Sequence, residues 1–224
     1  LSTCEKMLTY GVESECDMRA SDVELRENGV FFVLNYEGKE YHVELGIPGK
    51  FSVYNALTAL SALAVSGIPV DRAVACLKKA RGVKGRIEVV NTGRDFSVII
   101  DYAHTPDGLD NVLQTIRGFA KGRVITVFGC GGDRDKGKRP KMGKIASKMS
   151  DYCVVTSDNP RTENPNAIIE DIMVGVREGG GDYTVVPNRF EAIEFALDHA
   201  KKDDIILLAG KGHETYQILA DRTI

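Results

Sequence analysis

The chain contains no apolar run that approaches the roughly 20 residues needed to span a membrane as a helix. Its first residues, 1–6, carry neither an initiator Met nor a signal-peptide pattern. Neither charge sign dominates, because 29 Lys and Arg residues are interspersed with 32 Asp and Glu residues for a net charge of −3. The balanced charge predicts a protein that binds neither nucleic acid nor a membrane, so any anion-binding site must be a local arrangement. We expect the protein to be cytoplasmic.

Cysteine pairs are also lacking. The five cysteines are widely scattered, and no two of them form a Cys-x-x-Cys pair: they are Cys4, Cys16, Cys76, Cys130 and Cys153. Because their number is odd and most have apolar neighbours, we expect most of them to be small buried thiols in a reducing compartment.

Two phosphate-binding motifs are incomplete. Gly129 and Gly131 open like a dinucleotide fingerprint, but Arg134 stands where the third glycine would fall, which argues against a Rossmann oxidoreductase. The segment 132–139 has the Gly and Lys spacing of a P-loop, yet Arg139 replaces the Ser or Thr that must hold Mg²⁺. The sequence therefore contains no P-loop.

The first third of the chain predicts a hairpin followed by helices. Apolar and β-branched residues at 30–35 and 40–45 flank Glu37-Gly38-Lys39, a pattern typical of a β-hairpin. Residues 51–66 are apolar all round and predict a well-buried helix. A second helix is expected from Pro69 to about residue 80.

After a glycine-containing polar stretch at 81–86, which predicts a hinge, the pattern alternates strands with helices. Short apolar runs lie at 97–100, 124–128, 152–156, 183–186 and 205–209. Helical stretches lie at 109–119, 141–149, 167–177 and 189–200. This alternation predicts an α/β fold with a Rossmann-like, mostly parallel sheet covered on both faces.

Four clusters of Gly, charged and polar residues each begin directly after one of these apolar runs. They are 101–107, 129–134, 157–161 and 210–214. Ligands of open α/β sheets bind outside the carboxyl ends of the strands, so all four clusters should converge on one edge. Loops of this kind favour Gly, Asp and Asn in any case. Because the four also contain Arg, His, Lys and Glu, a binding site is the favoured interpretation.

A metal site at Asp101, His104 and Asp107 would need a helix, whereas Pro106 keeps Thr105 out of helical geometry. We expect Asp107 to help cap the following helix and His104 to contact a ligand. The pair at 213–214 has no second His at helical spacing, so a zincin site is unsupported.

Five motifs in order give the sequence its specific character. They are Gly85-Arg86-Ile87-Glu88, Asp101-Tyr102-Ala103-His104-Thr105-Pro106, the stretch 129–140 (GCGGDRDKGKRP), Asp158-Asn159-Pro160-Arg161 and Gly210-Lys211-Gly212-His213-Glu214. The set resembles the Mur ligase family and, within it, the ligases that add meso-2,6-diaminopimelate to UDP-MurNAc-L-Ala-D-Glu.

The resemblance implies ATP-dependent amide formation through an acyl phosphate during peptidoglycan synthesis, with Mg²⁺ as cofactor. Residues 1–85 would be the C-terminal portion of a central ATP-binding domain, and residues 86–224 an amino-acid-binding domain. The P-loop, the UDP site and most Mg²⁺ ligands would lie outside this chain, so we expect a fragment that is inactive alone. Two alternatives stay open: an isolated amino-acid- or nucleotide-binding module, and a ligase similar to folylpolyglutamate synthetase.

The resemblance also implies binding residues. ATP would contact Asn55, Arg86, Asp101 and His104. Meso-diaminopimelate would contact Arg134, Asp158, Asn159, Pro160, Arg161, Gly210 and Glu214. Its distal end is a zwitterion, so guanidinium groups would bind the carboxylate while Glu214 accepts the ammonium. Three of these residues also have a structural alternative. Asn55 could be a hydrogen-bonded polar residue of a helix, Arg86 could form an interdomain salt bridge, and Arg161 could be a surface loop residue.

Overall fold

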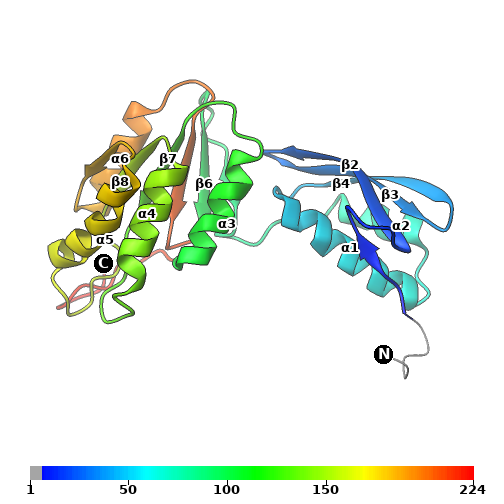
Figure 1. Cartoon of the computed structure of the whole chain (residues 1–224), viewed down its shortest axis with the longest axis horizontal. Coiled ribbons are helices and arrows are strands. Elements are labelled where there is room, and N and C mark those ends of the chain that lie inside the picture. Colours follow the sequence, from blue (N-terminus) through cyan, green and yellow to red (C-terminus); the bar gives the residue numbers. More distant parts are fainter. Residues whose placement is uncertain (1–6) are drawn as a thin grey trace. The chain divides into compact units, whose positions relative to one another are not determined.

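The structure, a computed structural model, describes residues 7–224, so Cys4 and the N-terminal residues discussed above lie outside the described part. The chain forms two compact units, residues 1–82 and 83–224 (Figure 1). This division lies close to the boundary expected at 85/86. The assignment of the two segments to a central and an amino-acid-binding domain stays a prediction.

The first unit is a small sheet with two helices. Its strands, in the spatial order β1-β2-β3-β4, are β1 (Tyr10–Gly11), β2 (Met18–Arg26), β3 (Gly29–Tyr36) and β4 (Lys39–Leu45). Helices α1 (Lys50–Val65) and α2 (Val70–Leu77) share one apolar core with β2, β3 and β4. Strand β2 was not expected from the sequence; a register shift between Ser21 and Glu24 interrupts its pairing with β3.

The predicted hairpin is confirmed. Tyr36 pairs with Lys39, so the loop has two residues, Glu37 and Gly38, with φ angles of 50° and 72°. Two positive φ angles in a two-residue loop are the geometry of a type I′ turn, whose twist matches that of the flanking strands. This short loop fixes the register of the β3–β4 ladder.

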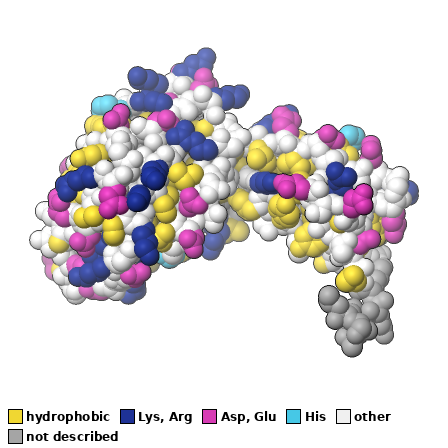
Figure 2. Space-filling model, viewed as in Figure 1, with side chains coloured by type: hydrophobic (Ala, Val, Ile, Leu, Met, Phe, Trp, Pro, Cys, Tyr) yellow, Lys and Arg dark blue, Asp and Glu magenta, His cyan; other side chains and the backbone are white. Residues whose placement is uncertain are grey.

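Helix α1 confirms the predicted segment, but the expectation that it is buried all round is wrong. Its buried residues are Ser52, Val53, Ala56, Leu57, Leu60 and Ser61, which lie at helical spacing on one face. Phe51 and Tyr54 on the other side are 42% and 39% exposed. The apolar composition of α1 predicted burial on all sides, but within this unit the sheet and α2 cover only one side of the helix. Hydrophobic side chains (yellow) accordingly gather over part of this unit in Figure 2.

The segment between α2 and the second unit should be the preferred site of proteolysis. It contains no helix or strand from residue 78 to residue 87, and residues 81–84 are exposed. We expect limited trypsin digestion to cut first after Lys79, Arg81 or Lys84, because an exposed, irregular chain fits a protease cleft. Mass spectrometry should show a resistant piece that begins near residue 85. Persistence of this segment while other sites are cut would contradict the two-unit division.

The second unit is a six-stranded sheet in the spatial order β5-β6-β10-β7-β8-β9. The strands are β5 (Glu88–Val90), β6 (Ser97–Asp101), β7 (Val124–Phe128), β8 (Tyr152–Val155), β9 (Tyr183–Val185) and β10 (Ile205–Ala209). All pairs are parallel except that of β5 with β6. The predicted mostly parallel α/β sheet is confirmed, whereas the short strand β5 was not expected.

Helices cover both faces of this sheet. They are α3 (Pro106–Arg117), α4 (Lys138–Met149), α5 (Pro165–Gly179) and α6 (Arg189–His199). Helices α3, α4 and α5 bury their apolar faces in one core cluster, and α6 belongs to a second cluster on the other face. All five residues of β7 are buried, as a central strand covered on both sides requires. Figure 1 shows this layered arrangement. Within the described residues, no helix has the length and apolar character to cross a membrane.

Candidate functional site at the carboxyl edge of the parallel sheet

The strand order brings the four polar clusters together. Strand β10, the last in sequence, lies between β6 and β7, so β6, β10, β7 and β8 are consecutive neighbours and all run in one direction. Their following loops therefore emerge at one edge, as predicted. Backbone hydrogen bonds join these loops: Gly210 N donates to Asp101 O at 3.0 Å, and Gly132 N donates to Asn159 O at 2.9 Å.

The loops after β7 and β8 are tied by side chains as well. The Asp133 carboxylate accepts hydrogen bonds from Thr162 N at 3.2 Å and from Thr162 Oγ1 at 2.8 Å. Asp133 N in turn donates to Glu163 Oε1 at 2.6 Å. Gly132 lies so close to the Pro160 carbonyl that a Cβ there would clash with it. Asp133 and Glu163 thus hold the loops after β7 and β8 together.

Arg139, which occupies the Ser/Thr position of the rejected P-loop, is an internal anchor. Its side chain is 1% exposed. Nη1 donates to Glu163 Oε2 at 3.1 Å and to Asp171 Oδ2 at 2.9 Å, and Nη2 donates to Glu163 Oε1 at 2.9 Å. The hydrogen bonds from Arg139 lower the pKa of Glu163 to about 2, helped by the backbone of Asp133. A buried guanidinium at the start of α4 therefore supports the loop after β8.

Arg161 presents part of its guanidinium to the edge. Nη1 donates to Gly132 O at 2.9 Å and to Asn159 O at 3.3 Å. Nε and Nη2 have no hydrogen-bond partner among the described residues, which leaves one side of the fork for an anion. The backbone of Arg161 is left-handed, with φ at 51°, a strain that persists only where surroundings enforce it. Arg134 is exposed nearby on the loop after β7, and its Nη1 donates to Asp133 O.

Asp158 lies beneath the edge against a buried arginine that the sequence reasoning missed. Asp158 Oδ1 accepts from Asn159 N at 2.7 Å, while Oδ2 lies 3.9 Å from Nη1 of Arg189. Arg189, at the start of α6, donates from Nη2 to Ala209 O at 3.0 Å. Burial lowers the pKa of Arg189, while the charges of Asp158 and Glu214 oppose that shift. Gly210 has a φ of 108°, and a Cβ at this position would lie 3.1 Å from Asp158 Oδ2.

Lys211 is the second residue that the sequence reasoning missed. Its Nζ donates to Asn159 Oδ1 at 2.9 Å and lies 3.5 Å from Glu214 Oε2. Asn159 Nδ2 donates to the same Glu214 oxygen at 3.1 Å. Asn159 is only 5% exposed, so much of its amide is already used inside the protein. The sequence signal that could have identified Lys211 is its position three residues before Glu214, which places a cation near that carboxylate.

Residues after 214 close over the loop after β8. Gln217 Nε2 contacts Asp158 O and Ser157 Oγ. Ile218 N donates to Asn159 Oδ1 at 2.9 Å, and Ile218 O accepts from Arg161 N. Gln217 also pairs with Ile224 through backbone hydrogen bonds, which folds residues 217–224 into a small hairpin. The sequence carried no clear signal for this hairpin.

Asp101 and Arg86, predicted to contact ATP, both lie in the second unit: Asp101 is the last residue of β6, and Arg86 lies just before β5. Both carboxylate oxygens of Asp101 accept backbone hydrogen bonds, Oδ2 from Ile87 N at 2.9 Å and Oδ1 from Ala103 N at 2.7 Å. Burial raises the pKa of Asp101, although these bonds and Arg86 oppose the shift. Asp101 thus holds the residue after Arg86 in place, and Arg86 itself is exposed.

His104 is exposed at the same edge, as expected. Its Nδ1 lies 2.9 Å from Tyr102 O. Because a carbonyl oxygen only accepts, we place the proton on Nδ1, which leaves Nε2 available to a ligand. Thr105 has the predicted extended backbone, but the expectation that Asp107 caps α3 is wrong. Thr105 is the N-cap, since its side chain accepts from Gly108 N, and Asp107 lies in the first turn.

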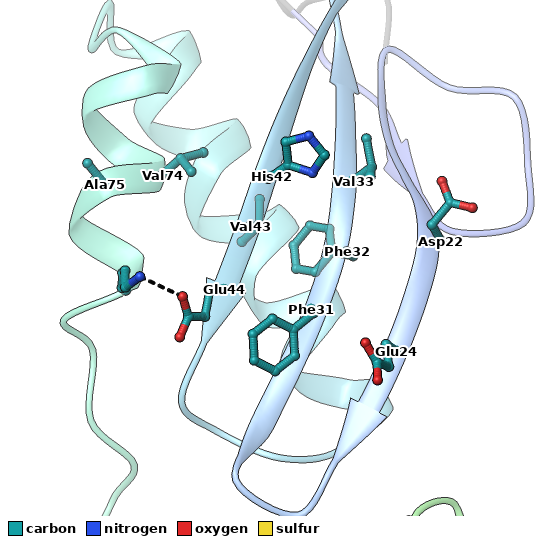
Figure 3. Close-up of a pocket in the computed structure, with 11 residues that line it drawn as sticks. Asp22, Glu24, Phe31, Phe32, Val33, His42, Val43, Glu44, Val74 and Ala75 are labelled. Carbon is teal, nitrogen blue, oxygen red and sulfur yellow. Dashed lines mark ion pairs between the residues drawn. The ribbon is translucent and has the colours of Figure 1, made fainter.

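The first unit contains Asn55 and a hollow over its sheet. Asn55 is exposed on α1, and its contact with adenine stays a prediction. The hollow lies over β2, β3, β4 and α2, where Figure 3 shows the rings of Phe31 and Phe32 beside the carboxylates of Glu24 and Glu44. Glu44 pairs with Lys78 at 2.7 Å. Asn55 does not line this hollow. The acidic residues at the rim of the hollow make it unsuited to bind phosphate.

Metal ligands and reactive thiols do not add to the site. Within residues 7–224, no group of three or more His, Cys, Asp or Glu side chains is arranged to hold a metal ion. Cys130 and Cys153 are buried, and burial raises the pKa of each thiol to about 12. The prediction of buried thiols is correct for these two, whereas Cys16 is half-buried and Cys76 is exposed.

Sequence comparison identifies the family. Residues 85–212 match the model of the Mur ligase glutamate ligase domain, and residues 2–63 match the Mur ligase middle domain. The chain belongs to the Mur ligase family. This Mur ligase chain is 53% identical over 219 residues to the UDP-N-acetylmuramoyl-L-alanyl-D-glutamate–2,6-diaminopimelate ligase 1 of Clostridium acetobutylicum, covering 97% of the chain and 45% of the relative. It is 48% identical over 223 residues to the corresponding ligase of Listeria monocytogenes, covering 100% and 45%.

Solved structures agree. A UDP-N-acetylmuramoyl-L-alanyl-D-glutamate–2,6-diaminopimelate ligase matches 97% of the Mur ligase chain and 45% of its own, with a TM-score of 0.77 and 36% identity. A folylpolyglutamate synthase of Thermotoga maritima shares the fold, with a TM-score of 0.66 at 22% identity over 87% of this chain and 44% of its own. The chain thus spans about half the length of the relatives it matches.

Proposed function

We propose that the protein containing this chain is an ATP-dependent ligase that adds meso-2,6-diaminopimelate to UDP-MurNAc-L-Ala-D-Glu during peptidoglycan synthesis. The observation that carries the proposal is the pairing of opposite charges at the carboxyl edge. The partly free guanidinium of Arg161 and the carboxylate of Glu214 lie on separate loops, and both contact Asn159. A zwitterionic amino-acid end requires an anion-binding and a cation-binding group side by side.

Recognition of the distal end divides among seven residues. Arg134 and Arg161 bind its carboxylate, and Glu214 accepts its ammonium with the Gly210 backbone alongside. Asp158, Asn159 and Pro160 hold the loop that carries Arg161. Folylpolyglutamate synthesis is the weaker candidate because a glutamate substrate has no distal ammonium for Glu214.

ATP supplies the phosphoryl group that converts the D-Glu carboxylate into an acyl phosphate, which the amino group of diaminopimelate then attacks. We assign residues 1–85 to the central ATP-binding domain, with Asn55 at the adenine. Arg86, Asp101 and His104 of the C-terminal domain would contact ribose and phosphates. These groups offer hydrogen bonds and one guanidinium, which suits a nucleotide. We place most of the Mg²⁺ ligands outside this chain, and the enzyme in the cytoplasm.

Product formation tests this proposal. The full-length protein should convert UDP-MurNAc-L-Ala-D-Glu with ATP and meso-diaminopimelate into a tripeptide detectable by mass spectrometry, and far more slowly with L-lysine or L-glutamate. The 224-residue chain alone should give no product, because its sequence has no P-loop. A full-length enzyme that prefers L-glutamate would overturn the assignment, and product from the purified chain alone would overturn the fragment interpretation.

A further inference from the structure

Lys211 occupies a nearly enclosed position between the groups proposed to recognise the amino acid. Its side chain is 13% exposed and that of Glu214 is 15% exposed. The ammonium has three acceptors around it: Asn159 Oδ1 at 2.9 Å, Tyr216 O at 2.7 Å and Glu214 Oε2 at 3.5 Å. Three acceptors match the three N–H donors of a lysine ammonium. The geometry is therefore that of a charged lysine bound within its own protein.

The orientation of Asn159 follows from this contact. Since an ammonium only donates, the amide oxygen must face Lys211, and Ile218 N donates to the same oxygen. The amide nitrogen then faces the Glu214 carboxylate, which it reaches at 3.1 Å. Lys211 thus fixes the side chain that connects the Glu214 loop with the loop carrying Arg161.

The charges at this edge are unevenly matched. Glu214 has Lys211 beside it, and Asp158 has Arg189 at 3.9 Å. Arg161 donates only to backbone carbonyls and forms no ion pair with any described residue. Both carboxylates are therefore already compensated by cations of the protein, whereas the guanidinium of Arg161 is not. Among these five charged groups, only the guanidinium of Arg161 lacks a counter-charge on the protein.

We propose that Lys211 determines amino-acid specificity by compensating Glu214 before the substrate binds. A substrate ammonium must then share Glu214 with Lys211, and the two ammonium groups repel each other. The substrate binds despite this repulsion only when its neighbouring carboxylate is bound by Arg161. Diaminopimelate brings both charges, whereas lysine brings the ammonium alone. This inference rests on the proposed function and adds a residue that discriminates against lysine.

A purely structural role is the competing explanation, since Lys211 also bonds the backbone of Tyr216. The two explanations differ for substrates that each lack one distal charge. L-Lysine has the ammonium without the carboxylate, and 2-aminopimelate has the carboxylate without the ammonium. A structural tether would affect both analogues alike, whereas charge compensation affects them in opposite directions.

The test compares kcat/KM for meso-diaminopimelate, L-lysine and 2-aminopimelate in the full-length enzyme. The wild-type enzyme should use 2-aminopimelate better than L-lysine. Lys211→Met should raise use of L-lysine relative to diaminopimelate about tenfold and lower relative use of 2-aminopimelate by a similar factor. Lys211→Arg keeps the charge and should largely retain the wild-type order. Lys202→Met makes the same chemical change at an exposed site before β10 and should alter neither ratio.

The outcomes separate the two proposals. If the wild-type enzyme makes no product with diaminopimelate, the proposed function fails and this inference fails with it. If diaminopimelate is the substrate but Lys211→Met leaves both ratios unchanged, or shifts both analogues in the same direction, only the role of Lys211 is overturned. The order of kcat/KM for the two analogues can be measured in the wild-type enzyme without any variant. A wild-type preference for L-lysine over 2-aminopimelate therefore refutes the inference even if Lys211→Met does not fold.

Discussion

Replacing Arg161 with alanine should lower kcat/KM for meso-diaminopimelate about a hundredfold in the full-length enzyme, equivalent to about 2.7 kcal/mol. Only Nη1 of Arg161 donates to backbone acceptors, and among the described residues Nε and Nη2 have no hydrogen-bond partner, so we expect them to bind the distal carboxylate. Loss of the Arg161 side chain removes two charged hydrogen-bond donors to the substrate carboxylate at a partly desolvated edge of the sheet. The preference for diaminopimelate over L-lysine should fall by nearly the same factor, because lysine never used this contact.

Three measurements make that result specific to the carboxylate. The KM for ATP should change little, since Arg161 is not among the groups assigned to the nucleotide. Arg161→Lys should recover only part of the activity because an ammonium cannot reproduce a planar fork. Arg177→Ala, on an exposed arginine of α5 paired with Glu170, is the matched control and should retain wild-type kinetics. An unchanged diaminopimelate-to-lysine preference in Arg161→Ala would exclude Arg161 as the carboxylate-binding group.

Replacing Arg139 with alanine should lower the free energy of unfolding of the second unit by about 3 kcal/mol. The substitution removes a side chain that is 1% exposed. It leaves Asp171 without its cation, and Glu163 keeps only the exposed Lys136, whose Nζ lies 3.3 Å from Oε2. Those carboxylates are 18% and 47% exposed, so water can partly replace the lost partner and limit the cost. Urea unfolding followed by circular dichroism measures this change.

A surface pair on the same two helices provides the control. Lys144 of α4 and Glu178 of α5 form an ion pair with side chains 47% and 57% exposed, so Lys144→Ala should cost less than about 1 kcal/mol. The pH dependence gives a second check. The pKa of Glu163 is lowered to about 2 from 4.5, so its contribution is fully present above about pH 4.5 and is lost as the pH falls toward 2. Arg139→Ala should weaken this acid dependence, and equal losses in both variants would contradict the anchoring role.

The sequence was sufficient where local pattern decides structure. Alternating apolar runs and helical stretches predicted the parallel sheet, and the position of the polar clusters after those runs predicted the shared edge. The sequence did not predict contacts between residues that lie far apart in the chain and are brought together by the order of the strands. Lys211 and Arg189 could be read as ordinary loop and helix residues, because their partners Asn159 and Asp158 lie 52 and 31 positions away (211 − 159; 189 − 158).

Short or irregular elements were also missed for physical reasons. Strand β5 has only three residues, too few for a periodic pattern, and a register shift divides β2. The apolar composition of α1 gave its helical character correctly but not its exposure, which depends on what covers each face. The roles of Asn55, Arg86 and His104 toward ATP stay predictions, because the positions of these residues alone do not test them.

The place of β10 between β6 and β7 has a consequence for how the unit is made. Of the six strands in this sheet, the last to leave the ribosome is the one that joins β5-β6 to β7-β8-β9. Until it emerges, the two parts of the sheet have no backbone hydrogen bonds to each other, and the inner edges of β6 and β7 remain unpaired. Unpaired inner edges of this kind are prone to aggregation. The nascent chain would therefore need protection until its final strand arrives, and that strand completes the sheet and delivers Lys211 and Glu214 in the same step.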